Sequence, residues 1–212
     1  MKKIIGICGK ARHGKTTVAN YLVKKHGYAR ISYADALKEM IVGALVDSPP
    51  PIEIASQEFS EMTEAYWRDV FYVNRTAFSR WLMQFVGTDI VRNRIAEHYW
   101  LARWLKTYRG VPDRVVVPDV RFRNEAAQIR GMGGQIWRIE RLFLDGDPEE
   151  SQLQAIEHGA DHESETEMLK IPEDRLVQAS WGIENIYKAV DEILEAEKVL
   201  AALKTKKGGE LG

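Results

Sequence analysis

The sequence predicts an α/β domain of the doubly wound type, with about five parallel strands flanked by helices. Strand-like and helix-like segments alternate along most of its 212 residues. A glycine-rich loop follows the first apolar segment, KIIGIC, and the β-branched run RVVV at 114–117 is typical of a central parallel strand covered on both faces. In such a domain, crossover helices cover the sheet and ligands bind at the carboxyl ends of the strands.

The first elements follow from apolar spacing and from helix breakers. Residues 3–8 predict a short buried strand, and TTVANYLVKK at 16–25 repeats apolar residues at helical spacing until a glycine ends the helix. Residues 28–32 predict a second strand. ADALKEMIVGAL at 34–45 is helical, and the three prolines in the segment 47–53 predict a loop.

A long helical block, from about residue 57 to residue 108, separates the second predicted strand from the third. Helix breaks are expected near Val73-Asn74 and near Gly87-Thr88. The later elements alternate again. They are a strand at 114–118, a helix at 124–134 ended by glycine, strands at 135–141 and 174–180, and a long amphipathic helix at 181–203.

We expect one domain, residues 1–205, with a helical insertion at about 55–108 and a flexible tail at 206–212. The polar stretches LDGDPEESQ and HGADHESE favour a mobile lid at about 142–170 rather than a core element. The sequence assigns no role to His162, Ser164 and Glu165 in that segment.

Composition excludes several classes of protein. The formal net charge of -1 gives no long-range attraction to nucleic acid or to an anionic membrane. The single cysteine, Cys8, permits no internal disulfide, which fits a reducing cytoplasm, and no apolar run is long enough to span a bilayer. The tryptophan-rich helices between 60 and 105 are compatible with a homodimer surface or with a buried subdomain.

The stretch GKARHGKTT, residues 9–17, satisfies the phosphate-loop pattern G-x-x-x-x-G-K-[ST]. Its glycines allow the backbone to approach phosphate oxygens, and the helix that follows points its positive end at the anion. We expect Lys15 to reach the β and γ phosphates, and Thr16 and Asp119 to hold Mg²⁺. The residues assigned to the donor nucleotide are Gly9, Arg12, His13, Gly14, Lys15, Thr16 and Thr17.

Basic residues favour a phosphate as the acceptor. A hydroxyl acceptor needs a positioned base, whereas a phosphate monoester, with a second pKa of about 6, is already mostly ionised at neutral pH. Such an acceptor needs cations around it. Candidate cations fall near predicted strand ends or in the helical block, and they are Lys38, Arg80, Arg92, Arg121, Arg138 and Arg141.

From residue 3 to about residue 190 the chain resembles the bacteriophage deoxynucleoside monophosphate kinases. The segments that carry the resemblance are GKARHGKTT, SYADALKEM, LMQFVGTDIVRNRIAEHYW, VVVPDVRFRNEAAQIRGMGGQIWRIER and HESETEM. The resemblance implies transfer of the ATP γ-phosphate to a deoxynucleoside monophosphate, with Mg²⁺, in the host cytoplasm for a phage protein. Catalytic roles are implied for Lys15, Asp119, Arg121, Arg138 and Arg141. The residues implied on the acceptor side are Asp35, Lys38, Arg80, Gln84, Thr88, Arg92, Trp100, Asn124 and Glu125.

Some of these residues also have ordinary structural interpretations. Lys38 fits a solvated helix position, Gln84 a helix surface, Trp100 a core position, and Glu125 a carboxylate favoured by the start of a helix. The chain has Arg123 and Leu142 where the family commonly has proline, which leaves the path of the lid open.

Three other functions stay open from the sequence. A dephospho-coenzyme A kinase phosphorylates a ribose hydroxyl and needs a carboxylate base, for which Asp35 is a candidate. A deoxynucleoside kinase also transfers to a hydroxyl. A non-catalytic module would bind ATP without transferring phosphate.

Overall fold

The computed structural model describes residues 3–47, 62–142, 162–180 and 182–209, with the backbone alone for 204–209. These residues belong to two compact units. The sheet unit comprises residues 1–30, 112–158 and 168–212, and the helical unit comprises 31–111 and 159–167.

The sheet unit contains five parallel strands in the order β2-β3-β1-β4-β5. Their bounds are Lys3–Cys8 (β1), Ala29–Arg30 (β2), Arg114–Val117 (β3), Gln135–Arg141 (β4) and Arg175–Ala179 (β5). In the register, Gly6 of β1 lies opposite Val117 of β3 and Ile136 of β4. The predicted parallel sheet of about five strands is therefore confirmed.

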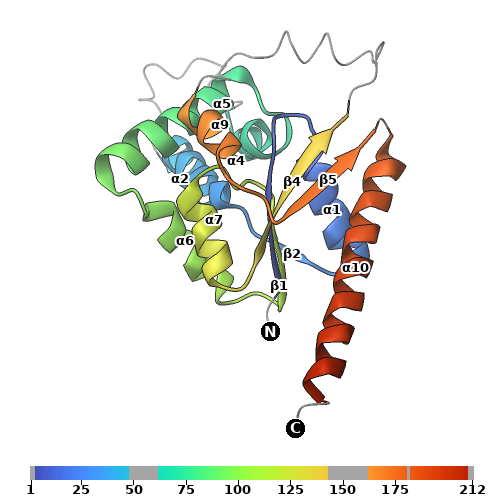
Figure 1. The fold of residues 1–212 in the computed structure, drawn as a ribbon. Coiled ribbons are helices and arrows are strands. Elements are labelled where there is room, and N and C mark those ends of the chain that lie inside the picture. The colour runs from blue at the N-terminus through green and yellow to red at the C-terminus, as the bar shows by residue number, and fades with distance from the viewer. Residues whose placement is uncertain (1–2, 48–61, 143–161, 181, 210–212) are drawn as a thin grey trace, which may run out of the picture. The chain divides into compact units, whose positions relative to one another are not determined.

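Helices cover both faces of this sheet, as Figure 1 shows for α1 (Lys15–His26), α7 (Arg123–Gly131) and α10 (Ile183–Gly209). The period of two along β1 assigns its side chains to the two faces. Ile5 and Ile7 belong to the core that α1 and α10 close. A Cβ on Gly6 would lie 2.7 Å from Ile129 of α7, so this glycine lets α7 approach the opposite face closely.

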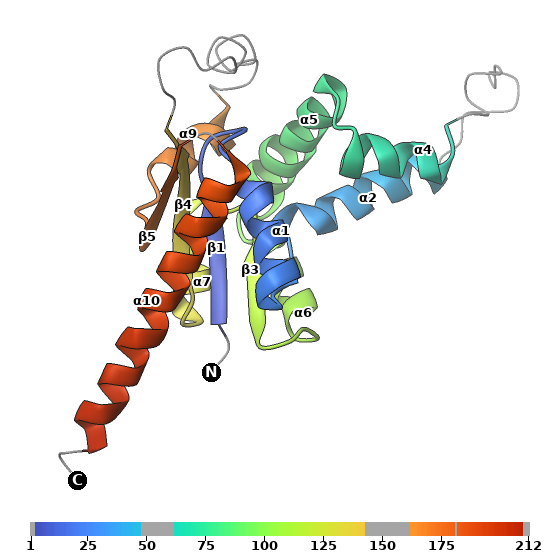
Figure 2. The same cartoon turned by 90° about the vertical axis from the view of Figure 1, so that its right-hand side faces the viewer.

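Helix α10 is longer than predicted. It continues through Gly209, four residues into the segment 206–212 that was expected to be a tail, and residues 210–212 lie outside the described chain. Figure 2 shows its C-terminal part running past the end of the strands. Glu197 ties the helix back to the sheet, because Lys3 Nζ lies 2.6 Å from its carboxylate.

The helical unit packs its helices around an apolar core that includes Leu37, Phe71, Val91 and Trp100. Two of its helices have the wider π geometry, with hydrogen bonds from residue i+5 to residue i. The helices are α2 (Tyr33–Asp47), α4 (Glu64–Arg68), η1 (Asp69–Val73), α5 (Ala77–Gln84), η2 (Phe85–Ile95) and α6 (Tyr99–Tyr108).

One predicted helix break is confirmed and one is wrong. Helix η1 ends at Val73, and Asn74 follows as its C-cap. At Gly87-Thr88 the chain stays helical within η2. A Cβ at Gly87 would lie 2.6 Å from Leu37 Cδ2, so this glycine permits close packing of η2 against α2 instead of breaking the helix.

The structure describes only the two ends of the predicted lid at 142–170. Residues 143–161 lie outside the described chain, as do 48–61, which include most of the predicted proline loop. Residues Glu163–Leu169 form helix α9, and both Ser164 and Met168 are buried. This part of the segment is thus an element with buried side chains. In the described ranges, no helix combines the length and the apolarity that a membrane span requires.

Candidate active site

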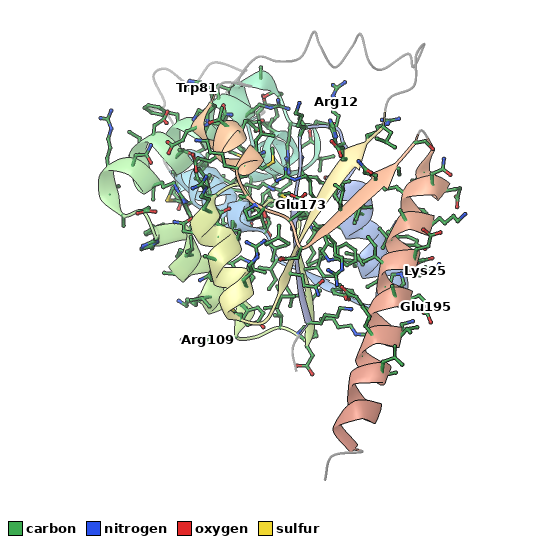
Figure 3. All side chains as sticks on the ribbon, viewed as in Figure 1. Arg12, Lys25, Trp81, Arg109, Glu173 and Glu195 are labelled. Carbon is green, nitrogen blue, oxygen red and sulfur yellow. The ribbon has the colours of Figure 1, made fainter. Side chains whose placement is uncertain are left out.

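The phosphate loop has backbone conformations that its glycines make possible. Gly9 has φ 139° and Gly14 has φ 95°, both in the region that residues with a Cβ rarely adopt. A Cβ on Gly9 would also lie only 2.4 Å from the carbonyl oxygen of Ile139. Arg12, with φ 63°, is the one residue other than glycine at positive φ in the described chain. Figure 3 shows its side chain at the carboxyl end of the strands, where ligands of such sheets bind.

Lys15 begins helix α1, and its side chain folds back over the loop. Its Nζ donates hydrogen bonds of 2.6 Å to the carbonyl oxygens of both Gly9 and Lys10. The first turn of α1 contains no acidic residue, so nothing on the helix offsets the positive end of its dipole. The loop therefore gathers an ammonium group and a helix N-terminus, which together suit a polyphosphate.

A methionine from helix α9 contacts the start of the loop. The backbone N–H of Gly9 donates to the sulfur of Met168 over 3.2 Å, and Met168 is buried. These residues are 159 positions apart, so no local pattern in the sequence could have predicted this contact.

His13 is held on the other side of the loop by β4. Its Nδ1 accepts a hydrogen bond from the backbone N–H of Arg141 over 3.1 Å. Burial lowers the pKa of His13 below its ordinary 6.5, and the nearby cations Lys15 and Lys10 lower that pKa further. The ring is therefore held in its neutral form.

Arg138, which was predicted to be catalytic, is engaged with the chain just before β5. Its Nε lies 2.9 Å from the Glu173 carboxylate, and another guanidinium nitrogen donates to the carbonyl of Ile171. The hydrogen bond from Arg138 lowers the pKa of Glu173. Arg138 also lies opposite Cys8, where burial raises the pKa of the thiol. The side-chain contacts of Arg138 tie β4 to the segment just before β5.

The segment after β3 positions the predicted metal ligand. The backbone N–H of Val120 donates to the carbonyl oxygen of Ile7 over 3.1 Å, which fixes the turn containing Asp119 beside the end of β1. The buried carboxylate of Glu125 accepts hydrogen bonds from the backbone N–H groups of Arg121 (2.8 Å) and Phe122 (3.1 Å). Glu125 thus caps the start of α7, as its ordinary structural interpretation predicted, and shapes the turn that bears Arg121 just before the helix, in which Asn124 lies.

The predicted metal ligands of the protein are one hydroxyl and one carboxylate. No group of three or more His, Cys, Asp or Glu that could hold a metal occurs in the part of the chain that the structure describes. Magnesium in phosphoryl-transfer sites takes most of its ligands from phosphates and water, with one or two from the protein. A threonine hydroxyl and one carboxylate, Thr16 and Asp119, are enough protein ligands for that mode.

In the helical unit, the predicted acceptor residues begin at the start of α2. The backbone N–H of Ser32 donates to Asp35 Oδ2 over 3.1 Å, and Asp35 Oδ1 lies 3.7 Å from Lys38 Nζ. The Lys38 side chain is only 2% exposed, so it is not the solvated helix residue of the ordinary interpretation. Asp35 is a helix cap and an ion-pair partner.

Four predicted acceptor residues recur every fourth position along α5 and η2, at Arg80, Gln84, Thr88 and Arg92. At about 3.6 residues per turn, three such steps would rotate the side chains by about 120° around an α-helix. A step of four residues is slightly more than one turn of an α-helix but less than one turn of the wider π-helix, so the two offsets have opposite signs. The change of helix type at Phe85 therefore keeps the four side chains near one face. Arg80 is exposed, whereas Thr88 and Arg92 are buried.

Trp100 is placed in the core of the helical unit. It is 6% exposed, and its indole N–H donates to the carbonyl oxygen of Gly87 over 2.8 Å. This position matches its ordinary interpretation as a core residue and leaves little of the ring for stacking on a base.

Helix α9 is capped by one of the residues that had no assigned role. His162 Nδ1 accepts from the backbone N–H of Ser164 over 3.2 Å, and its Nε2 lies 3.5 Å from Asp89 of η2. Asn93 of η2 donates to Glu163 over 2.8 Å. These contacts join the start of α9 to η2 within the helical unit.

A parallel sheet with a glycine-rich phosphate loop after its first strand, followed by a helix that begins with lysine and threonine, defines the class of P-loop nucleotide-binding proteins. Comparison with protein families narrows the class. Residues 52–169 match the model of the deoxynucleotide monophosphate kinase family. A protein of Acanthamoeba polyphaga mimivirus named as a deoxynucleotide monophosphate kinase is 30% identical over 168 residues, which cover 72% of this chain and 83% of the viral one. The chain belongs to the deoxynucleotide monophosphate kinase family.

Solved structures with a similar arrangement are more distant in sequence. TT1252 from Thermus thermophilus is 18% identical (TM-score 0.46), with 92% of this chain and 97% of that chain covered. Shikimate kinase from Aquifex aeolicus is 16% identical (TM-score 0.43; 92% and 98%). Dephospho-CoA kinase from Campylobacter jejuni is 11% identical (TM-score 0.46; 92% and 97%).

Proposed function

We propose that the protein transfers the γ-phosphate of ATP to the 5′-phosphate of a deoxynucleoside monophosphate. The observation that carries the proposal is the phosphate loop, with the Lys15 ammonium folded over it, in a chain of the deoxynucleotide monophosphate kinase family. An acceptor phosphate oxygen attacks the γ-phosphorus, the bond from that phosphorus to the β,γ-bridging oxygen breaks, and ADP leaves with the bridging oxygen.

The sheet unit binds the donor in this proposal. Backbone N–H groups of the loop and the Lys15 ammonium neutralise the β and γ phosphates. The Thr16 hydroxyl and the Asp119 carboxylate would hold Mg²⁺, which supplies charge neutralisation on the transferring group. Arg121 and Arg141 add positive charge from the carboxyl ends of two other strands. Arg138 would contribute only if it exchanged its contacts with Glu173 and Ile171.

The helical unit binds the acceptor. Lys38 and Arg92 are buried and positively charged, which suits a phosphate dianion, and Arg80 with Gln84 continues the same line of side chains. A phosphate acceptor needs no base, because it is already ionised at neutral pH. Asp35 is engaged by Ser32 and Lys38, which disfavours it as the free carboxylate base that a hydroxyl acceptor requires.

The finer assignments are part of the same proposal. We infer a viral source of the bacteriophage type, with activity in the host cytoplasm, from the resemblance of the motifs. Residues 142–170 would close over the bound nucleotides, and helix α9 lies at the C-terminal end of that segment. A homodimer surface on the helices between 60 and 105 is also part of the proposal. The exposed aromatic residues Phe78, Trp81 and Phe85 of α5 and η2 are the candidates for it.

The proposal is tested by ADP release, coupled to a spectrophotometric assay, with a panel of acceptors. The panel contains the four common deoxynucleoside monophosphates, dephospho-coenzyme A, deoxynucleosides, and no acceptor. We expect ADP release that depends on at least one deoxynucleoside monophosphate. We expect no release with dephospho-coenzyme A, with deoxynucleosides or without an acceptor. Release with dephospho-coenzyme A or a deoxynucleoside alone would establish the corresponding alternative kinase. Binding of ATP without release under any condition would favour the non-catalytic module.

A further inference from the structure

A chain of four side chains in the helical unit ends at the buried ammonium of Lys38. The guanidinium of Arg68 on α4 donates two hydrogen bonds of 3.1 Å to the carboxylate of Glu39 on α2. The hydroxyl of Tyr72 on η1 donates to the same carboxylate over 2.5 Å. The ring of Tyr72 then presents its face to Lys38, whose Nζ lies 4.5 Å from the ring centroid.

Each link of this chain restricts the next. The two-pronged contact of a guanidinium with a carboxylate fixes the plane of both groups, so Glu39 has little freedom to rotate. The hydrogen bond from Tyr72 to Glu39 then fixes where the ring lies, and both burial and this bond raise the pKa of Tyr72, which keeps the hydroxyl as a donor. Hydrogen bonds from Arg68 and Tyr72 lower the pKa of Glu39, which keeps its carboxylate charged.

The fixed ring of Tyr72 in turn restricts the position of the Lys38 ammonium. The face of an aromatic ring attracts a cation, and this attraction is stronger where water is excluded, as it is for a side chain that is 2% exposed. Asp35 Oδ1 also lies 3.7 Å from the ammonium. The ring therefore helps to set the position of the ammonium without placing a further negative charge beside it.

We propose that Tyr72 is a positioning residue that aims the Lys38 ammonium at the phosphate of the acceptor nucleotide, with Glu39 and Arg68 fixing the ring. This inference rests on the proposed function, in which Lys38 binds the acceptor. It assigns a role to η1, a segment for which the sequence suggested only helix.

The test measures Michaelis constants for the acceptor and for ATP in Tyr72→Leu, Tyr72→Phe, Lys38→Met and the double variant Tyr72→Leu/Lys38→Met. Tyr66→Leu is the matched control, because Tyr66 is an exposed tyrosine on α4 whose ring packs against Trp67. Circular dichroism and thermal unfolding verify that each variant is folded.

We expect Tyr72→Leu to raise the Michaelis constant for the acceptor about five- to tenfold and to leave that for ATP unchanged. Tyr72→Phe keeps the ring and loses the hydroxyl, so it should restore most of the wild-type value. In the Lys38→Met background, Tyr72→Leu should have no further effect, because its contribution passes through the ammonium. Tyr66→Leu should behave as wild type.

The outcomes separate the inference from the proposed function. An effect of Lys38→Met on the acceptor with none from Tyr72→Leu, or additive effects in the double variant, overturns the inference and leaves the function in place. Equal weakening of ATP and acceptor by Tyr72→Leu also overturns it, since a general loss of structure would act on both. Absence of transfer by the wild-type protein to every deoxynucleoside monophosphate overturns the proposed function itself, and the inference with it.

Discussion

The backbone N–H of Arg141, the last residue of β4, donates a hydrogen bond to Nδ1 of His13 in the phosphate loop. An imidazolium carries hydrogen on both ring nitrogens and cannot accept this bond. The contact therefore depends on a neutral ring, and the conformation of the loop is linked to pH. Burial, followed by the charges of Lys15 and Lys10, lowers the pKa of His13.

The first prediction concerns this linkage. The folded-state pKa of His13 lies below the unfolded value of 6.5. Above pH 6.5 the ring is neutral in both states, so it does not lower the free energy of unfolding there. Stability is then lost as the pH falls from 6.5 toward the lowered folded-state pKa. We expect the ring of His13 to titrate with a midpoint below 6.5 in an NMR titration. His13→Asn, which keeps an acceptor and does not titrate, should weaken this loss on urea unfolding. A midpoint at or above 6.5 would contradict the account.

The second prediction concerns Gly9. A Cβ at this residue would meet the carbonyl oxygen of Ile139 at 2.4 Å, and its φ of 139° is strained for alanine. We expect Gly9→Ala to reduce the free energy of unfolding by about 2 kcal/mol or more. Gly131→Ala is the control in the same unit, since a Cβ there meets nothing within 4 Å, and it should change stability by less than about 1 kcal/mol. Equal stability of the two variants in urea would refute the packing argument.

The third prediction separates capping from substrate binding at Glu125. Its carboxylate accepts the backbone N–H groups of Arg121 and Phe122, so Glu125→Ala should cost about 1–2 kcal/mol of unfolding free energy. Glu125→Gln keeps an acceptor oxygen and should lose less than half of that. The measurement is urea unfolding in the absence of nucleotides. Unchanged stability of Glu125→Ala, with a raised Michaelis constant for the acceptor, would return Glu125 to the substrate-binding residues.

The fourth prediction concerns the contact between α1 and α10 at Asp191. Lys25 and Tyr21 donate to its carboxylate over 2.8 Å each, and Figure 3 shows Lys25 beside α10. The hydrogen bond from Lys25, with those from Tyr21 and His26, lowers the pKa of Asp191 to about 2. A lowered carboxylate pKa means that the stabilisation is complete above 3.8 and is lost as the pH falls through about 2.

Because Asp191 is partly exposed, the effect is modest. We expect Asp191→Asn to lower the Tm by about 2 to 4 °C at pH 7, a difference that shrinks below about pH 4. Glu195→Gln is the control on the same helix, since its ion pair with Lys198 is exposed on both sides. A Tm difference that stays constant down to pH 2 would exclude the ionised carboxylate as its cause.

Local patterns were sufficient to predict the sheet. The run RVVV at 114–117 and the segment QIWRIER became β3 and β4, because continuous apolar or alternating residues of this kind fit only strands of a covered sheet. The helix from Lys15 ended where Gly27 supplies a left-handed C-cap. Gly87 was wrongly predicted to break a helix. A single sequence does not distinguish a helix-breaking glycine from one that is needed for close packing, here against Leu37.

The site was less accessible to sequence reasoning, because its contacts join distant segments. The phosphate loop is contiguous and was predicted from its spacing. Met168 contacts Gly9 across 159 residues and Arg138 pairs with Glu173 across 35, and nothing local marks either contact. The π geometry of η2 depends on packing and on hydrogen bonds to residue i+5, which single-sequence periodicity does not reveal. Lys38 was expected on the acceptor side from resemblance, while its aromatic partner Tyr72 was missed.

The central claim is that this protein moves the γ-phosphate of ATP onto a deoxynucleoside monophosphate with Lys15 neutralising the donor. ³¹P NMR of a reaction containing ATP, Mg²⁺ and the accepted deoxynucleoside monophosphate tests it most directly, because it identifies the products. The account predicts equal growth of ADP and deoxynucleoside diphosphate resonances, with no inorganic phosphate, and at least a 100-fold slower reaction in folded Lys15→Ala, roughly the loss of one charge-stabilising group. Inorganic phosphate as the main product, or near wild-type turnover in Lys15→Ala, would contradict it.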